Sequence, residues 1–369
     1  MKRPLKSIYI HMPFCKSKCN YCGFVSYSGK ESLIEAYFEA LHKGIAAKMG
    51  GFESNNIETL YVGGGTPSVI DHAYYEQLLS AITPPPGAEI TMEVNPGTVS
   101  YEYLKNLRHA GFNRLSIGVQ SFDNKTLKTL GRIHTAHEAL TTVEEAKNAG
   151  FENISIDLMY GLPEQTPDNW EKTVLKALEL DVNHISTYCL KIEDGTKFFH
   201  NMPDSLPDED ATSEMFISTA KILSENGFEH YEISNHAKKG CESKHNLAYW
   251  RNQEYFGFGA GAHGYVNRVR YSNNPNLEEY IANPLRLVTQ NTLSDEEIIE
   301  EGIFLGLRLA KGIDIAQFRE EYDIDIPQKY APVIEKYVSC GLMEFTDGML
   351  RLTTNGMLVS NTIMAEFLE

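Results

Sequence analysis

Short apolar runs alternate with longer amphipathic stretches through the first half of the chain. The short runs are rich in Ile, Val and Leu and predict strands at 7–11, 59–63, 89–94, 114–119, 154–159 and 184–190. The stretches between them carry apolar residues at helical spacing, among them 33–49, 99–111, 137–150 and 169–180. Several of these stretches end at Gly, a common helix stop. We therefore expect βαβ units in an α/β fold with a parallel sheet, closest to an incomplete TIM-like (β/α)6 barrel.

The pattern changes in the second half of the chain. Residues 236–290 are rich in Gly, Asn and aromatic residues and show little periodicity, so we expect an irregular but ordered excursion over the barrel. Residues 291–369 return to helical spacing and then carry LMEFTDGMLRL, which predicts a hairpin turning at Asp347-Gly348. Helices followed by a hairpin predict a small winged-helix-like domain. The expected division is thus 1–235 for the barrel core, 236–290 for the excursion and 291–369 for the C-terminal domain.

Composition and charge narrow the class of protein. The chain has 369 residues, 42% of them hydrophobic, and a net charge of −17. A strongly negative chain is a poor binder of nucleic acid or of an anionic membrane surface, so neither is expected as a partner. The sequence contains no apolar run long enough for a transmembrane helix and no signal-peptide pattern, so we expect a cytoplasmic location. In that compartment clustered cysteines indicate metal binding or catalysis.

Three cysteines stand close together in the segment CKSKCNYC. Cys15, Cys19 and Cys22 have the spacing C-x3-C-x2-C, with no fourth cysteine nearby. Thiolates bind zinc or iron–sulfur clusters. A structural zinc ion takes four ligands, whereas three cysteines on a [4Fe-4S] cluster leave one iron open to a small chelating molecule. A zinc-bound scaffold remains the alternative interpretation.

Polar or Gly-rich features follow the other predicted strands. They are GGGTP at 63–67, Glu93, Gln120 and Asp157, with Arg132 a little further along the chain. In a parallel α/β barrel the C-terminal ends of the strands meet at one face and carry function. Glycines there allow the backbone to approach a ligand closely, Glu93 could pair with an ammonium group, and Arg132 with a carboxylate.

These motifs together resemble a known family. IYIHMPFCKSKCNYC, YVGGGTPS, EVNPGT, GFNRLSIGVQSFD, LGRIHT, IDLMYGLPEQT and EISNHA occur in order over nearly the whole chain. The pattern resembles radical S-adenosylmethionine (SAM) proteins of the coproporphyrinogen III oxidase-like family. The resemblance implies a radical-SAM partial (β/α)6 barrel with a C-terminal domain, and it implies that Cys15, Cys19 and Cys22 hold a [4Fe-4S] cluster whose open iron is chelated by SAM.

The resemblance also assigns residues to SAM. Tyr9, Gly64, Gly65 and Glu93 match positions around the SAM that chelates the cluster. In the oxygen-independent oxidase a second SAM is bound, and the positions around it correspond here to Tyr21, Thr66, Gln120, Arg132 and Asp157.

Two departures separate this chain from the oxidase. The oxidase has a further cysteine two residues after the third ligand, where this chain has Phe24, and it has a long segment before the first strand, where this chain has a short one. Both point to the haem chaperone branch, HemW. SKHNLAYW at 243–250 also matches the HNxxYW motif of that branch, which makes His245, Asn246, Tyr249 and Trp250 the candidate haem-binding residues. The alternative haem ligands are His236, Cys241 and His263.

Two functions follow from the resemblance. The favoured one is a haem chaperone that delivers haem, as cargo, to respiratory haemoproteins. The alternative is an oxygen-independent coproporphyrinogen III dehydrogenase, in which the cluster reduces SAM and the resulting radical drives oxidative decarboxylation. The expected partners are haem, recipient haemoproteins, an electron donor such as flavodoxin or ferredoxin if SAM is cleaved, and a second copy of the chain in a homodimer.

Overall fold

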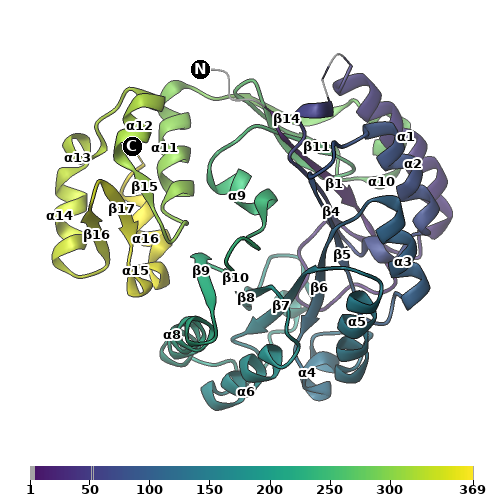
Figure 1. Cartoon of the computed structure of the whole chain (residues 1–369), viewed down its shortest axis with the longest axis horizontal. Coiled ribbons are helices and arrows are strands. Elements are labelled where there is room, and N and C mark those ends of the chain that lie inside the picture. Colours follow the sequence, from purple (N-terminus) through teal and green to yellow (C-terminus); the bar gives the residue numbers. More distant parts are fainter. Residues whose placement is uncertain (1–4, 51, 53, 369) are drawn as a thin grey trace.

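A curved sheet forms the body of the molecule (Figure 1). The structure is a computed structural model that describes residues 5–50, 52 and 54–368; the short segment before the first strand lies partly outside these residues. Over the described residues the sheet has twelve strands in the order β14-β13-β12-β11-β1-β4-β5-β6-β7-β8-β10-β9.

The centre of the sheet is parallel and consists of the strands that the sequence predicts. They are β1 (Ser7–Met12), β4 (Thr59–Gly64), β5 (Glu89–Val94), β6 (Arg114–Gln120), β7 (Asn153–Tyr160) and β8 (His184–Cys189). Their registers are parallel throughout. The expected α/β barrel is therefore confirmed, and over the described residues it is incomplete, because the sheet has two free ends, β14 and β9.

Helices cover the outer face of the arc (Figure 1). They are α1 (Ile34–Lys48), α2 (His72–Ile82), α3 (Tyr101–Ala110), α4 (Asn124–Thr129), α5 (Ala136–Asn148), α6 (Pro167–Leu178) and α8 (Glu209–Glu225). Side-chain caps begin most of them; Thr135 and Glu138 form a capping box at α5. Gly111, with φ of 117°, ends α3 in the left-handed conformation that Gly adopts without strain. Short α7 (Lys197–His200) lies in the loop after β8.

The segment expected to be an irregular excursion is regular structure, and that expectation is wrong. β10 (Asn235–Lys238) and β9 (Phe228–Glu232) extend one end of the sheet. At the other end β11 (Tyr255–Phe258) pairs in parallel with β1, followed by β12 (His263–Val266), β13 (Val269–Asn273) and β14 (Leu287–Thr292). The helices α9 (Lys244–Trp250) and α10 (Leu277–Ala282) lie between these strands.

Close backbone contacts explain why the sequence pattern hid these strands. A Cβ on Gly257 would lie 1.7 Å from the carbonyl oxygen of His263, and one on Gly264 would lie 2.2 Å from the ring of Tyr271. Gly weakens the usual strand signal, so strands built around such contacts do not show apolar alternation.

The C-terminal residues form a separate small unit. Its elements are α11 (Asp295–Gly306), β15 (Ile313–Asp314), α12 (Ile315–Tyr322), α13 (Ile326–Lys329), α14 (Ala331–Ser339), β16 (Met343–Thr346), β17 (Met349–Leu352), α15 (Thr354–Leu358) and α16 (Ser360–Ala365). Asp347 and Gly348 both have positive φ, which is the type I′ hairpin turn expected from the sequence. The order of helices and the three-stranded sheet is that of a winged helix.

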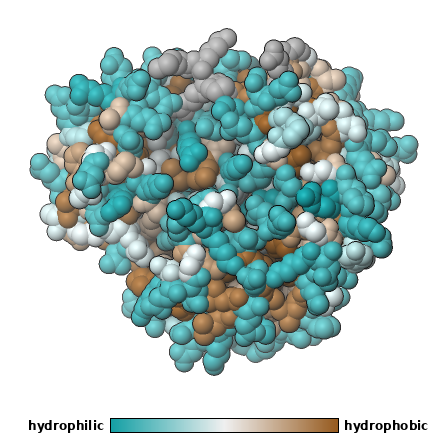
Figure 2. Space-filling view, viewed as in Figure 1, coloured by the Kyte–Doolittle hydropathy of each residue, from teal (hydrophilic) through white to brown (hydrophobic). Residues whose placement is uncertain are grey.

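The face seen in Figure 2 is mostly hydrophilic, with smaller apolar groups between the polar residues, as the composition leads one to expect. Among the described residues, no helix has both the length and the apolar character needed to cross a membrane.

Candidate cluster and cofactor site

The cysteine loop begins at the end of the first strand. Cys15 is buried in the short strand β2 (Phe14–Cys15), which pairs with β3 (Tyr27–Ser28), while Cys19 and Cys22 are half-buried in the turn between them. The amide of Cys22 donates to the carbonyl of Cys19 over 3.3 Å. Burial raises the pKa of the Cys15 and Cys22 thiols, so the protein alone does not favour their thiolates.

The GGGTP loop is fastened to the cysteine strand by backbone hydrogen bonds. The amide of Gly65 donates to the carbonyl of Met12, and that of Thr66 to the carbonyl of Phe14, each over 2.8 Å. A Cβ on Gly65 would lie 3.0 Å from the sulfur of Cys15 and closer still to both carbonyls. The glycine is therefore required for the close packing of this loop against the first cysteine.

Donors from two loops reach the cysteine sulfurs. Thr66 Oγ1 donates to Cys15 Sγ over 3.4 Å, and Arg132 Nη1 donates to Cys19 Sγ over 3.6 Å. Asn95 joins these donors, because its Nδ2 donates to Thr66 Oγ1 over 2.8 Å and its Oδ1 accepts from Arg132 Nη2. Hydrogen bonds to coordinating sulfurs and a nearby positive charge stabilise thiolate ligands, so the residues present fit a thiolate-bound cluster.

The geometry does not match a single-ion site. Within the described residues, no three His, Cys, Asp or Glu side chains converge closely enough to hold one metal ion. In a [4Fe-4S] cluster each cysteine ligates a different iron.

Glu93 occupies the end of β5 beside this loop. Its Oε2 accepts from the amide of Gly64 and its Oε1 from the hydroxyl of Tyr61, each over 2.9 Å. Burial, and secondarily the charge of Asp157, raises the pKa of the Glu93 carboxyl to about 7. A carboxylate in this setting is poised to pair with a cationic group that replaces the lost water.

The residues matched to a second SAM lie at neighbouring strand ends. Arg132 Nη2 donates to the carbonyl of Gly118 over 2.7 Å, and its guanidinium also bonds to Tyr21. Asp157 accepts from the hydroxyl of Ser116, and burial raises its pKa. Gln120 is buried with φ of 65°, an uncommon conformation for a residue other than glycine.

Tyr9 faces the interior, where its hydroxyl is already engaged. The hydroxyl donates to His11 Nδ1 over 2.9 Å, and His11 Nε2 donates to the carbonyl of Val25 over 2.7 Å, on the cysteine loop. Burial lowers the pKa of His11 to about 4, which keeps the imidazole neutral and able to make both bonds.

The structure places His245, the expected haem ligand, inside the barrel with both ring nitrogens hydrogen-bonded. The side chain is 1% exposed, Nδ1 bonds to Thr59 Oγ1 over 2.8 Å, and Nε2 bonds to the Tyr249 hydroxyl over 2.9 Å. Thr59 begins β4, so His245 lies at the opposite end of the barrel strands from the cysteines. A haem iron needs a free nitrogen lone pair, and here both nitrogens are occupied.

The other residues of the HNxxYW motif are also built into the fold. The amide of Asn246 donates to the capping Ser243 hydroxyl over 3.3 Å, while Tyr249 and Trp250 are half-buried. Of the alternative ligands, His236 is buried and stacks on His230 at 4.1 Å, Cys241 is half-buried, and His263 is exposed at the start of β12.

Sequence reasoning missed three residues that shape the site. These are Tyr61, Asn95 and His11, which contact Glu93, Thr66 and Tyr9 respectively. Each lies within one of the motifs, YVGGG, EVNPG and IYIHM, but alternation along a strand indicates only the face of a side chain and not its partner.

Two family models match the chain. The Radical SAM superfamily matches residues 9–177, and the HemN C-terminal domain matches residues 293–359.

Curated relatives match over nearly the full length. Heme chaperone HemW of Lactococcus lactis is 38% identical over 371 residues, which covers 98% of this chain and 97% of the relative. Heme chaperone HemW of Bacillus subtilis is 37% identical over 378 residues, covering 99% of each.

Among solved structures, coproporphyrinogen III oxidase (HemN) from Escherichia coli superimposes with a TM-score of 0.85 at 23% identity. The match covers 99% of this chain and 90% of that one. It shows that the two proteins share a fold. On its full-length similarity to these relatives, the chain belongs to the HemW family of radical SAM proteins.

Proposed function

We propose that this protein is a haem chaperone, which binds haem and passes it to haemoproteins, on a scaffold that holds a [4Fe-4S] cluster and SAM. The observation that carries the proposal is the similarity of the whole chain, at 38% identity, to a relative named as a heme chaperone. Phe24 supports it, since an exposed phenylalanine stands where the oxidase has a further cysteine; its side chain is 68% exposed on the cysteine loop.

The cluster belongs on Cys15, Cys19 and Cys22 in this proposal. When bound, the cluster and SAM would supply one-electron reductive chemistry at the open iron. Thr66 and Arg132 donate hydrogen bonds to two of the sulfurs and so hold them in the orientation of ligands.

SAM is assigned to the strand ends around Glu93. The Glu93 carboxylate would pair with the SAM ammonium group. The backbone at Gly64 and Gly65 would lie against the amino-acid portion of SAM, and Tyr9 would contact the same molecule. A second SAM, contacted by Tyr21, Thr66, Gln120, Arg132 and Asp157, is the finer part of the proposal.

The partners in this proposal are haem, respiratory haemoproteins that receive it, and a flavodoxin or ferredoxin if SAM is cleaved. A homodimer is also proposed. The haem ligand is not assigned to His245, because that imidazole has no free nitrogen in this fold.

One experiment tests haem binding and haem transfer together. Cluster-loaded protein is titrated with haem under anaerobic conditions, and the Soret band is followed. A saturable Soret shift followed by transfer of haem to an apo-haemoprotein is expected. Protein that binds no haem with its cluster intact would overturn the proposal.

A further inference from the structure

The α9 helix lies on the concave side of the curved sheet (Figure 1). Its N-terminus is held by Glu89 at the start of β5, whose carboxylate accepts from the amides of Lys244 and His245, each over 3.1 Å. The His245 imidazole then bonds to Thr59 at the start of β4. The helix is thus anchored on the N-terminal ends of two central strands, on the side away from the cysteines.

Aromatic rings connect this helix to the cofactor end of the barrel. The His245 ring stacks on Tyr61 with centroids 5.1 Å apart and planes 24° apart, and Tyr61 stacks on Tyr9 at 6.2 Å. The Tyr61 hydroxyl donates to Glu93 Oε1 over 2.9 Å. The orientation of the Glu93 carboxylate therefore depends on a ring that rests directly on His245.

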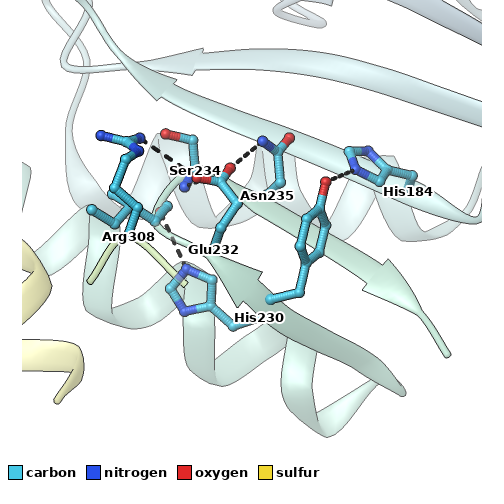
Figure 3. Close-up of polar contacts among 8 residues, drawn as sticks. His184, His230, Glu232, Ser234, Asn235 and Arg308 are labelled. Carbon is cyan, nitrogen blue, oxygen red and sulfur yellow. Dashed lines mark hydrogen bonds and ion pairs between the residues drawn. The ribbon is translucent and has the colours of Figure 1, made fainter. Parts of the chain in front are cut away.

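The same helix contacts the C-terminal unit at its other end. The guanidinium of Arg308, just after α11, lies over the Trp250 ring at 4.3 Å. Figure 3 shows Glu232 of β9 turned toward Arg308 and Asn235; Glu232 is fully buried, and its carboxylate lies 3.5 Å from Arg308. Two backbone hydrogen bonds connect the same parts of the chain: Ile233 N donates to Arg308 O over 3.2 Å, and Ala310 N donates to Tyr231 O over 3.0 Å.

We propose that the HNxxYW motif is a positioning element for SAM binding rather than a haem ligand. Tyr249 and His245 fix the position of the Tyr61 ring, and through it the orientation of the Glu93 carboxylate. Trp250 contacts Arg308 and so connects α9 to the C-terminal unit. The inference rests on the proposed assignment of SAM to Glu93, and it requires that haem does not bind at His245 or Tyr249.

Three features distinguish this role from that of a haem site. His245 is 1% exposed and both of its ring nitrogens are hydrogen-bonded, so iron coordination would require breaking the hydrogen bond at the coordinating nitrogen and opening the barrel around the imidazole. The contacts run without a gap from Tyr249 through His245 and Tyr61 to Glu93. The carboxylate at the end of that series accepts from the amide of Gly64 in the GGGTP loop.

The test uses full-length, cluster-loaded protein and measures two affinities in each variant. SAM binding is followed by equilibrium dialysis and by the change that SAM causes in the EPR signal of the reduced cluster; haem binding is followed by the Soret band. The variants are Tyr61→Phe, Tyr249→Phe, His245→Ala and Trp250→Leu. Tyr103→Phe is the matched control, because the Tyr103 hydroxyl also makes one hydrogen bond, to the carbonyl of Ile70 over 2.7 Å, but on the outer helices.

We expect Tyr61→Phe to weaken SAM binding by about tenfold, the effect of losing one hydrogen bond to an ionised group. Tyr249→Phe acts through His245, and Trp250→Leu acts through the placement of α9, so each should weaken SAM binding by about threefold. Haem affinity should stay within about twofold in every variant. Tyr103→Phe should change neither.

Two results would overturn the inference. One is SAM affinity unchanged in both Tyr61→Phe and Tyr249→Phe, which are conservative enough to fold even if His245→Ala does not. The other is loss of haem binding on substitution of His245 or Tyr249, whatever happens to SAM. Failure of the unsubstituted protein to bind haem would instead count against the proposed function, and the SAM measurements would still stand.

Discussion

At the residue scale, Glu93 is the group whose charge matters most for the site. Its carboxyl is buried, and its pKa is raised from 4.5 to about 7. Between about pH 4.5 and pH 7 the Glu93 carboxyl is ionised in the unfolded chain but protonated in the folded protein. Stability from this group is therefore fully present below about pH 4.5 and is lost as pH rises through about 7.

The variant Glu93→Gln tests how ionisation of Glu93 changes the free energy of unfolding. Gln keeps the shape and cannot ionise, so the cofactor-free variant should gain on the unsubstituted protein by roughly 2–3 kcal/mol in free energy of unfolding between about pH 4.5 and pH 8. Urea unfolding at several pH values measures the difference. A difference that stays constant over this range would contradict the burial of an ionisable group here. The same variant should bind SAM about tenfold more weakly, since it cannot pair with an ammonium group.

Gly65→Ala tests the packing of the loop against the cysteines. The added Cβ would meet Cys15 Sγ at 3.0 Å and two backbone carbonyls at under 3.0 Å, so we expect the loop to move and the cluster content, measured as iron per chain, to fall by at least about half. Gly44→Ala, in α1 with neighbours at 3.7 Å or beyond, is the control and should keep full loading. Equal iron content in the two variants would contradict the account.

The residues at the site were predictable to different degrees. The cysteines, Gly65 and Glu93 stand in motifs whose spacing and strand-end position indicate their chemistry. The motif match that made His245 a candidate haem ligand carries no information on burial, and only the structure reveals that both ring nitrogens are hydrogen-bonded. Asn95 was overlooked because its role is to connect Thr66 and Arg132, two residues far apart in sequence.

At the element scale, an ion pair between buried Glu232 and Arg308 helps to join β9 to the C-terminal unit. Burial raises the pKa of Glu232, and Arg308 opposes that rise. Arg308→Met would leave a buried carboxylate without its cationic partner, and we expect it to lower the free energy of unfolding by about 3 kcal/mol.

The double variant Glu232→Gln/Arg308→Met serves as the matched comparison. It removes both charges and should recover most of the lost stability, because replacing a whole buried pair is often neutral. Urea unfolding of the single and double variants decides the matter. A double variant less stable than Arg308→Met alone would show that the pair itself, and not the unpaired charge, carries the energy.

The hydrophobic pattern of the sequence predicts some helices and strands of the fold and misses others. Central strands buried on both faces appear as continuous apolar runs, and the Asp347-Gly348 turn has its own chemistry, so both were found. The strands β11 to β14 were missed. Two of them pack around Gly257 and Gly264, where backbone contacts replace the side-chain alternation that marks a strand.

At the scale of the whole molecule, buried neutral histidines set the response to acid. Burial lowers the pKa of His11 and His134 to about 4 and that of His245 to about 3. For each one the unfolded chain binds a proton below about pH 6.5 that the folded protein does not bind until the lower value. The stability they provide is present above about pH 6.5 and is lost as pH falls toward 4.

We therefore expect the free energy of unfolding of the cofactor-free protein to decrease as pH falls from about 6.5 to 4, at roughly 1.4 kcal/mol per pH unit for each histidine protonated on unfolding. Glu93, Asp157 and Glu232 contribute with the opposite sign, because burial raises the pKa of their carboxyls. They are fewer than the histidines whose pKa burial lowers. Chemical denaturation across this range measures the slope. Stability that is constant or rises toward pH 4 would mean that these histidines are not buried as described.

The central claim is that this chain carries haem and does not convert a porphyrin. The most direct measurement is anaerobic: cluster-loaded, dithionite-reduced protein with SAM is offered haem and coproporphyrinogen III in parallel. The Soret band reports haem uptake, and chromatography reports protoporphyrinogen IX and 5′-deoxyadenosine. The account predicts saturable haem binding and no decarboxylated porphyrin. Formation of protoporphyrinogen IX with matching 5′-deoxyadenosine would contradict it and identify an oxidase that has Phe24 in place of the further cysteine.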